Sequence, residues 1–239
     1  MRTTRSPLTL TALLAVVVHV SCSSDPDSVA FQFSFDFASA GQAGFIAGFA
    51  DYPPGDAPIY ELASGYQPLP APLTDRGRAL FIGGTNRSDD LFMYWTRQIA
   101  LQPETRYRVR FQVELATNAP MGCVGVGGSP GEGVTVKVGA SVVEPVPVLE
   151  GDILRMNIDK GNQTTSGADA IAVGDVANSQ NCAEEAPRYE LKTLSSDGQT
   201  FEVMTDSTGV SWILMGTDSG FEARSEIYYT RFVANFTPI

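Results

Sequence analysis

Histidine is almost absent from this sequence: His19 is the only one among 239 residues. It lies in an N-terminal segment that we expect to be removed, so the remaining chain has none. This absence excludes Ser-His-Asp and Cys-His catalysis, and it also excludes zinc sites built from histidine. Any chemistry must therefore rest on carboxylates, Lys, Arg, Tyr or Ser. Any bound metal would be a hard cation on oxygen ligands, for which calcium is the first candidate.

Basic residues are also scarce, with 16 Lys and Arg against 27 Asp and Glu and a net charge of −11. Two of the basic residues, Arg2 and Arg5, belong to the same N-terminal segment, so the remaining chain is more acidic still. An acidic surface repels phosphate backbones, and we therefore expect no nucleic-acid partner. Acidic surfaces favour solubility and cation binding instead.

Long hydrophobic runs are absent as well. The apolar stretch over residues 8–20 has 13 residues, whereas a membrane-spanning helix needs roughly 20. Because Arg2 and Arg5 precede this stretch, residues 1–21 are predicted to be a secretory signal peptide.

The end of this segment resembles a bacterial lipobox, because the small residue Ser21 directly precedes Cys22. His19 departs from the motif, which has an aliphatic residue at that position. The resemblance implies that Cys22 is lipidated and that the protein is anchored outside the cytoplasm, to a membrane of the bacterial envelope. Residues 22–30 would then be a polar tether. The alternative is ordinary signal cleavage nearby and a soluble secreted protein.

The three cysteines agree with this interpretation, since an even pair, Cys123 and Cys182, remains once Cys22 carries lipid. In an exported protein such a pair can form a disulfide. It would close a loop of about 60 residues and contribute about 4 kcal/mol in the chain-entropy model. The alternative is two unpaired buried thiols.

Short apolar runs and abundant glycine (23) and proline (15) favour strands and turns over long helices. Strict alternation of apolar and polar residues predicts half-buried strands at residues 31–37 and 106–115. About ten predicted strands indicate an all-β fold in which residues 31–239 form one antiparallel two-sheet β-sandwich with few or no helices. The other expected strands lie within residues 78–84, 134–140, 153–159, 170–177, 188–194, 200–205, 211–217 and 225–236.

Two segments fit more than one interpretation. Residues 91–99 fit one face of a helix, but the alternating strand pattern that follows them favours a strand. Residues 118–133 form a glycine-rich loop that fails as a phosphate-binding loop, because Pro130 stands where a dinucleotide fingerprint has glycine and no Gly-Lys-Ser/Thr follows.

Two resemblances support these predictions. The stretch LQPETRYRV and the closing strand resemble those of jelly-roll carbohydrate-binding modules and galactose-binding-like domains, which implies a jelly-roll-like sandwich. The strings DYPPGD, NRSDDLFMYWTRQI, GCVGVGGSPGEGV, MNIDKGNQ and GTDSGFE resemble an uncharacterised family of exported bacterial proteins, often with lipoprotein signals. The resemblance to that family implies an exported protein with a single domain. It implies no activity, because none is known for the family.

Candidate site residues lie in four polar loops that are expected to meet at one rim of the sandwich. Asp89, Asp159, Asp218 and Glu222 are predicted metal ligands for calcium, although no EF-hand motif is present. The predicted ligand-binding residues are Asp51, Tyr52, Asn86, Arg87 and Asn162. The alternative for all of these polar residues is a role in turns and loop hydrogen bonds.

Aromatic residues separate into surface and core candidates. Tyr52, in a proline-rich loop, is the best candidate for stacking on a sugar ring, whereas Trp95 and Trp212 are expected in the core. Asp89 and Asp90 are neighbours, so they cannot both face one site from a strand. Asp89 is expected to turn toward the loop cluster, and Asp90 toward solvent or an arginine.

We predict non-enzymatic binding of a ligand, with a glycan as the first candidate, by a membrane-anchored protein. One alternative is a polysaccharide hydrolase or lyase that uses Asp89 with Glu222 or Asp218, because glycoside hydrolysis needs only two carboxyl groups. A second alternative is a structural envelope lipoprotein.

Overall fold

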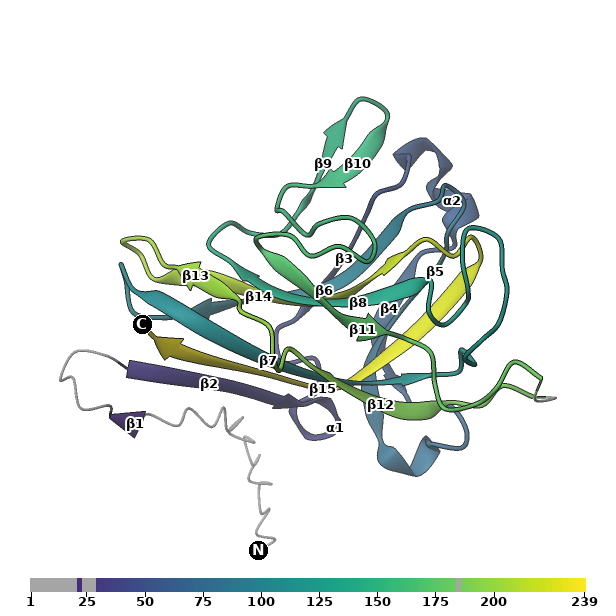
Figure 1. Cartoon of the computed structure of the whole chain (residues 1–239), viewed down its shortest axis with the longest axis horizontal. Coiled ribbons are helices and arrows are strands. Elements are labelled where there is room, and N and C mark those ends of the chain that lie inside the picture. Colours follow the sequence, from purple (N-terminus) through teal and green to yellow (C-terminus); the bar gives the residue numbers. More distant parts are fainter. Residues whose placement is uncertain (1–20, 23–28, 184–185) are drawn as a thin grey trace, which may run out of the picture.

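The protein is an antiparallel two-sheet β-sandwich (Figure 1). The computed structural model describes residues 21–22, 29–183 and 186–239. The strands are β1 (Ser21–Cys22), β2 (Val29–Asp36), β3 (Ile46–Ala50), β4 (Ala63–Pro68), β5 (Arg78–Thr85), β6 (Leu91–Ala100), β7 (Arg106–Thr117), β8 (Val134–Ser141), β9 (Pro147–Glu150), β10 (Ile153–Met156), β11 (Ala170–Asp175), β12 (Glu190–Ser195), β13 (Glu202–Met204), β14 (Val210–Ser219) and β15 (Arg224–Pro238). The short helices are α1 (Phe37–Ala40) and α2 (Ala57–Tyr60), and single 3₁₀ turns lie at Pro54–Asp56 and Thr74–Arg76.

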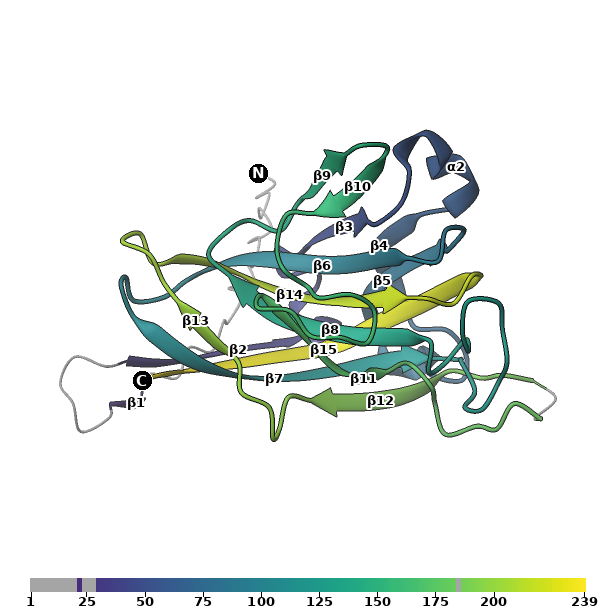
Figure 2. The same ribbon diagram turned by 45° about the horizontal axis from the view of Figure 1, so that its top comes forward.

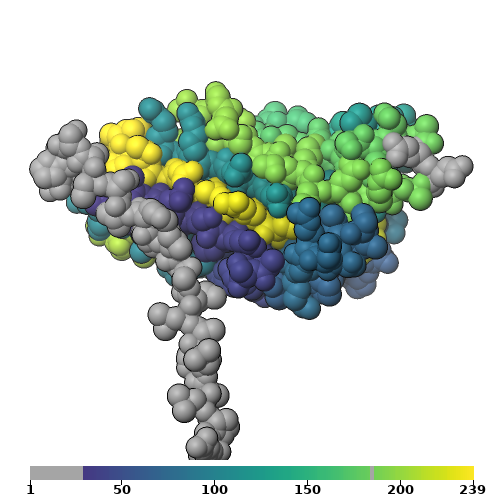
Figure 3. Space-filling view, turned by 90° about the horizontal axis from the view of Figure 1, so that it is seen from below, coloured from purple at the N-terminus to yellow at the C-terminus, as the bar shows by residue number. Residues whose placement is uncertain are grey.

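The larger sheet has eight strands, and the long strand β15 runs through its centre. One edge of β15 pairs with β7, whose far edge pairs with β12 and β13. The other edge pairs with β2 along its C-terminal half and with β5 along its N-terminal half. Figure 3 shows β2 in purple beside β15 in yellow on the outer face of this sheet. The closing strand therefore pairs with the first long strand.

The smaller sheet has five strands in the order β11-β8-β14-β6-β3. It stacks on the eight-stranded sheet, and the separate hairpin of β9 and β10 projects beyond it (Figure 2). This hairpin belongs to the connection between β8 and β11, and the parts of that connection on either side of the hairpin lie over the outer face of the five-stranded sheet.

The core lies between the two sheets and follows the two-residue period of the strands. In β7 the alternating residues from Tyr107 to Leu115 are buried, while the arginines between them are exposed or half-buried. In β6, Leu91, Met93 and Trp95 pack in the main core. The alternating pattern is the physical reason why the sequence predicts β7 correctly.

Several predictions are confirmed here, and some elements were not predicted. Residues 91–99 form the strand β6, and Cys123 and Cys182 form a disulfide with an S–S distance of 2.05 Å. The sequence did not indicate β3, β4, β9 or the two short helices. Strand β2 begins at Val29, two residues before the predicted start of the domain.

The N-terminal predictions lie largely outside the described residues. Residues 1–20 of the predicted signal peptide (residues 1–21) and residues 23–28 of the predicted tether (residues 22–30) are not described. The backbone of Ser21–Cys22 pairs with β2. Within the described part of the chain, none of the helices has the length and hydrophobicity that a membrane span requires. The lipidation of Cys22 stays a prediction.

Candidate functional site

The outer face of the five-stranded sheet is covered and partly buried. In β6 the residues that alternate with the core positions, Phe92 and Tyr94, point to this outer face and join Leu214 of β14 in a second apolar cluster. Ile158, from the segment that crosses the sheet, completes the cluster. Side chains on this face are therefore shielded from water, although they lie outside the main core.

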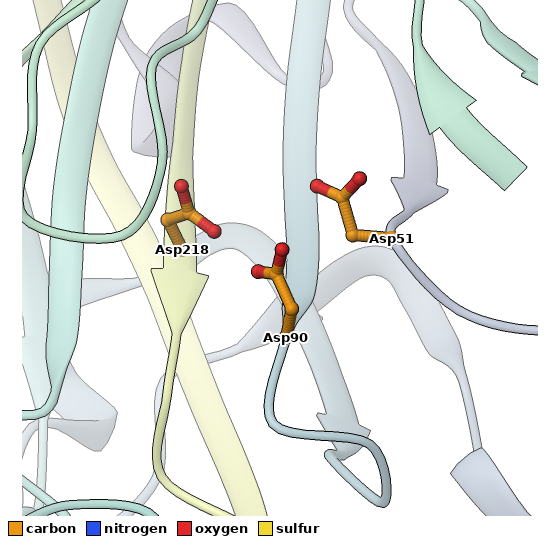
Figure 4. Close-up of side chains that lie close together, drawn as sticks. All are labelled: Asp51, Asp90 and Asp218. Atoms are coloured by element: carbon orange, nitrogen blue, oxygen red, sulfur yellow. The ribbon is translucent and has the colours of Figure 1, made fainter. Parts of the chain in front are cut away.

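Three aspartates meet on this covered face (Figure 4). Asp51 directly follows β3, Asp90 directly precedes β6, and Asp218 lies within β14. One carboxylate oxygen from each lies within 4.8 Å of those of the other two. Asp51 and Asp218 are 4% and 0% exposed, so two of the three carboxylates are removed from solvent.

The backbone at Asp51 adopts a left-handed conformation, with a φ of 64°. This conformation is unfavourable for a residue with a side chain and is retained where the surroundings impose it. At Asp51 it turns the chain at the end of β3, and the carboxylate ends in the cluster (Figure 4). Such strain is common at functional sites.

Two buried lysines neutralise the aspartates. The Nζ of Lys160 lies 2.8 Å from an oxygen of Asp218 and 2.9 Å from an oxygen of Asp51. The Nζ of Lys137 lies 3.3 Å from the same Asp218 oxygen. Burial alone would lower the pKa of Lys160, but the charges of Asp218 and Asp51 outweigh it and raise that pKa above its ordinary value. Lys160 is therefore charged at neutral pH.

Lys137 also holds the covering segment in place. It lies within β8 and is fully buried, and its Nζ donates hydrogen bonds of 2.6 Å to the carbonyls of Lys160 and Thr165. Burial lowers the pKa of this lysine. Because its partners lie in residues 157–169, Lys137 fixes that loop on the sheet and positions Lys160 over the aspartates.

Asp90 differs from the other two aspartates in its protonation. Burial, followed by the charge of Asp218, raises the pKa of Asp90 to about 8. Lys160 opposes this shift, whereas Asp51 adds to it. Asp90 therefore holds a proton at neutral pH, and its hydrogen bond with Asp218 agrees with a shared proton between them.

A cavity of about 530 Å³ opens above the cluster. Arg155 forms part of its wall, with Nη1 lying 3.4 Å from Asp51 and 3.7 Å from Asp90, and 42% of the Arg155 side chain is exposed. The cavity is lined mainly by polar residues: Asp51, Ser88, Asp89, Asp90, Glu150, Arg155, Met156, Ile158, Asp159, Lys160, Gly161, Asn162 and Gln163. We call this cavity and its lining the acidic pocket.

The cluster does not fit a calcium ion. Three carboxylates at this spacing resemble a set of cation ligands. However, the ammonium of Lys160 lies within 2.9 Å of two of them, and Lys137 contacts one of these two. A divalent cation at the centre would lie against two ammonium groups. The ammonium of Lys160 takes the place that a metal would need.

The acidic pocket contains some of the predicted site residues. Asp51 and Asp218 belong to the aspartate cluster, and Asn162 lines the pocket. Asp159 also lines it, but its carboxylate accepts the backbone N–H groups of Gly161 and Ala168 and forms a turn. These two hydrogen bonds lower the pKa of Asp159.

The interpretation of the adjacent pair Asp89 and Asp90 is wrong in one respect. Asp90, and not Asp89, turns into the cluster, because a left-handed backbone at Asp89 (φ 68°) redirects the chain between them. Asp89 is exposed at the edge of the pocket, and its carbonyl accepts a hydrogen bond from Gln163. Asp90 does lie near an arginine, Arg155, as expected.

Four other predicted site residues lie outside the lining of the acidic pocket. Tyr52 is 9% exposed and packs on Tyr60 with ring centroids 5.3 Å apart, so it is a core residue. Asn86 is buried, and its side chain donates to the carbonyl of Ser219. Arg87 is exposed and lies outside the pocket lining, near the carbonyl of Ile59.

Glu222 is the fourth. Its backbone N–H donates to the carbonyl of Val126, and its side chain lies against Gly127, in the glycine-rich loop. Glu222 is therefore no part of the aspartate cluster, and the predicted hydrolytic pair of Asp89 with Glu222 is not assembled in the acidic pocket.

Sequence reasoning missed the two lysines, Asp90 as the inward residue, and Arg155. A signal was present, because Lys137 and Asp218 are charged residues inside otherwise apolar strand patterns. In an exposed strand such residues face water, whereas here they occupy the outer positions of two paired central strands. The contribution of Lys160 and Arg155 depends on a loop crossing the sheet, and no local pattern predicts that crossing.

Comparisons with known proteins add a distant structural likeness. No protein-family model and no curated protein sequence matches this chain. Among solved structures, TmCBM61 in complex with β-1,4-galactotriose aligns with a TM-score of 0.35 and 8% identity, covering 83% of this chain and 92% of that one. The K3 cleaved adhesin domain of Lys-gingipain from Porphyromonas gingivalis aligns with a TM-score of 0.38 and 9% identity, covering 85% and 98%. Fold and site define an antiparallel two-sheet β-sandwich with an ion-paired polar pocket on one sheet.

Proposed function

We propose that this protein is a non-enzymatic, membrane-anchored extracytoplasmic β-sandwich that binds a glycan in the acidic pocket. The observation that carries the proposal is the pocket itself, a cavity of about 530 Å³ lined by charged and amide side chains that are fixed by ion pairs. Cavities of this order of volume are typical of small-ligand sites.

The lining favours a ligand rich in hydroxyl groups. Hydroxyls both donate and accept hydrogen bonds, and the pocket offers donors such as Arg155 beside acceptors such as Asp159. Apolar lining residues are few, Met156 and Ile158 among them, so an apolar ligand would leave many polar groups without partners. Because the ion pairs hold the side chains before binding, the entropy cost of ordering them is reduced.

The position of the pocket agrees with anchoring through the N-terminus. Strand β1, which contains Cys22, pairs with β2 in the eight-stranded sheet (Figure 1). The pocket is lined by residues on the outer face of the other sheet. A lipid on Cys22 would thus leave the pocket facing away from the membrane. The disulfide between Cys123 and Cys182 agrees with an oxidising compartment.

Arg155→Ala is expected to weaken glycan binding by roughly tenfold or more, because a charge-assisted hydrogen bond contributes about 1.5–3 kcal/mol. The measurement is a screen of neutral, amino and acidic polysaccharides by affinity electrophoresis, followed by calorimetry on the glycan that binds. The matched control is Arg87→Ala, which removes an exposed arginine outside the pocket lining and is expected to bind as the wild type does.

Asn162→Ala tests the same pocket without removing a charge, and we expect a several-fold loss of affinity. Circular dichroism confirms that each variant is folded. The proposal fails if no polysaccharide in the screen binds. It also fails if a glycan binds equally well to the wild type, Arg155→Ala and Asn162→Ala.

Cys22→Ser is expected to release the protein from membranes. A single acyl chain binds a bilayer only marginally, whereas lipidation of the lipobox type supplies several chains, so loss of the modification changes the partition strongly. The measurement is the incorporation of a fatty-acid analogue, together with membrane fractionation. A wild-type protein that takes up no label would exclude the anchor and leave a soluble secreted protein.

A further inference from the structure

A second pocket, of about 340 Å³, lies at the end of the sandwich where β7 ends and β15 begins. It shares no lining residue with the acidic pocket among the residues described. Its wall includes the apolar side chains Val176, Phe221 and Ile227 and three prolines. Val176 and Ile227 belong to the main core, so this pocket is an opening at the end of that core.

The glycine-rich loop over residues 118–133 lies at the end of the sandwich (Figure 2). It forms one wall of this pocket. Its glycines permit very close packing. A Cβ on Gly125 would lie 2.5 Å from the ring of Phe221, and one on Gly131 would lie 2.7 Å from the Cβ of Ala177. The loop is rich in glycine because its backbone lies directly against its neighbours. Close packing therefore accounts for the glycine-rich sequence, which a phosphate-binding role does not explain.

The disulfide secures the same wall. Cys123, in the glycine-rich loop, is bonded to Cys182, and both cysteines line the pocket. The two segments that carry them are therefore held together independently of any ligand. A pocket with covalently joined walls needs little ordering when a ligand binds.

One polar side chain inside the pocket lacks a partner. Ser225 is 8% exposed, and its Oγ has no hydrogen-bond partner among the described residues. Along β15 it lies on the same side as Ile227 and Tyr229, which are core residues, so its hydroxyl points inward between the sheets. Buried polar atoms almost always have a partner, and such an exception indicates a place for a ligand or a water molecule.

The charges at this pocket neutralise each other. Nη2 of Arg224 lies 2.8 Å from an oxygen of Glu226, and the hydroxyl of Tyr189 donates to the other oxygen of that carboxylate. An ionic ligand would have to break this pair or face an apolar wall. The pocket therefore favours an uncharged molecule.

We propose that this pocket is a second binding site, for a small uncharged molecule with a mainly apolar body and one hydroxyl or carbonyl group that hydrogen-bonds Ser225. Cavities of about 150 Å³ lined by apolar side chains bind benzene. A pocket of about 340 Å³ is therefore large enough for a molecule of one or two rings. This site does not depend on glycan binding in the acidic pocket.

Equilibrium dialysis of the oxidised protein against three probes tests the site: 1-naphthol, naphthalene and 1-naphthoate. All three contain the naphthalene ring system. 1-Naphthol carries a hydroxyl group, naphthalene has no polar group, and 1-naphthoate carries a negative charge. We expect saturable binding of one 1-naphthol per chain, several-fold weaker binding of naphthalene because Ser225 stays unpaired, and at least tenfold weaker binding of 1-naphthoate.

Variants locate the binding. Ser225→Ala is expected to abolish the advantage of 1-naphthol over naphthalene, and Ala119→Trp, which places a large ring in the pocket wall, is expected to abolish binding of both. The matched control is Ser211→Ala, because Ser211 is also a buried serine without a hydrogen-bond partner among the described residues, but it lies outside this pocket.

The proposal is overturned if no probe binds saturably to the wild type. It is also overturned if 1-naphthol keeps its advantage over naphthalene in Ser225→Ala, or if Ser211→Ala loses that advantage to the same extent. Ser225→Ala removes a single oxygen, so the test remains decisive even if Ala119→Trp does not fold.

Discussion

Replacing Lys160 by methionine is expected to lower the free energy of unfolding at pH 7 by about 3–5 kcal/mol, the usual cost of removing one partner of a buried ion pair. The Nζ of Lys160 contacts carboxylate oxygens of Asp51 and Asp218, which are almost fully buried. Without it, Lys137 alone would face Asp218, and Asp51 would keep only a contact with Arg155 at 3.4 Å. Urea denaturation followed by circular dichroism measures the change.

Lys192→Met is the matched control. Lys192 also forms a close ion pair, with its Nζ 2.7 Å from Asp175, but the two side chains are 24% and 34% exposed. Pairs in contact with solvent contribute little, and we expect a loss within about 1 kcal/mol. If Lys160→Met and Lys192→Met lose the same free energy of unfolding, the burial of the ion pairs of Lys160 does not make them stronger than an exposed pair, and the prediction is wrong.

A second substitution should restore part of the lost stability. In the double variant Lys160→Met with Asp218→Asn, one of the orphaned charges is removed, so the two effects are expected to be non-additive by about 1–3 kcal/mol. Additive losses would mean that Lys160 acts mainly through groups other than Asp218, such as the ring of Phe92, whose centroid lies 5.1 Å from its Nζ.

The free energy of unfolding is expected to fall as pH rises from about 4 to about 8. In the folded protein the pKa of Asp90 is raised to about 8, whereas the ordinary value of 3.8 applies to the unfolded chain. Between these values the folded state holds a proton that the unfolded state has released. The stabilisation from Asp90 is thus complete below about pH 4 and is lost as pH rises to 8, by up to about 1.4 kcal/mol per pH unit.

Asp90→Asn is expected to flatten this dependence and to make the protein more stable than the wild type at pH 8. The amide has no proton to lose, and it can still donate a hydrogen bond to Asp218. Thermal melts at one-unit steps from pH 5 to pH 8 measure the slope. Asp89→Asn, which changes the exposed neighbour, should leave the slope as it is. A wild-type slope that persists in Asp90→Asn would assign the titration to another group.

Much of the fold could be predicted because strands that cover a core carry a local pattern. The alternation from Tyr107 to Leu115 indicates both the strand β7 and the side that is buried, and the alternating residues at 31–37 do the same for most of β2. Strand β4 (Ala63–Pro68) was missed because it has no buried residue and therefore little alternation.

The site could be predicted only in part. Asp51, Asp218 and Asn162 were named because polar residues in loops between strands are candidates anywhere. Tyr52 was misplaced because a proline-rich loop suggested exposure, whereas α2 brings Tyr60 against its ring. The local sequence shows which residues carry a charge or an aromatic ring. It does not show which other segments of the chain bury them.

Sequence by itself determined the all-β class, the positions of most strands and the even cysteine pair, Cys123 and Cys182. These depend on the two-residue period and on composition, which are local. Only the tertiary structure decided that residues 142–169 cross the five-stranded sheet and bury Lys137, Lys160 and Asp218 together. The physical reason is that burial depends on contacts between segments distant in the chain. The protonation of Asp90 and the position of Lys160 in the cluster both follow from that burial.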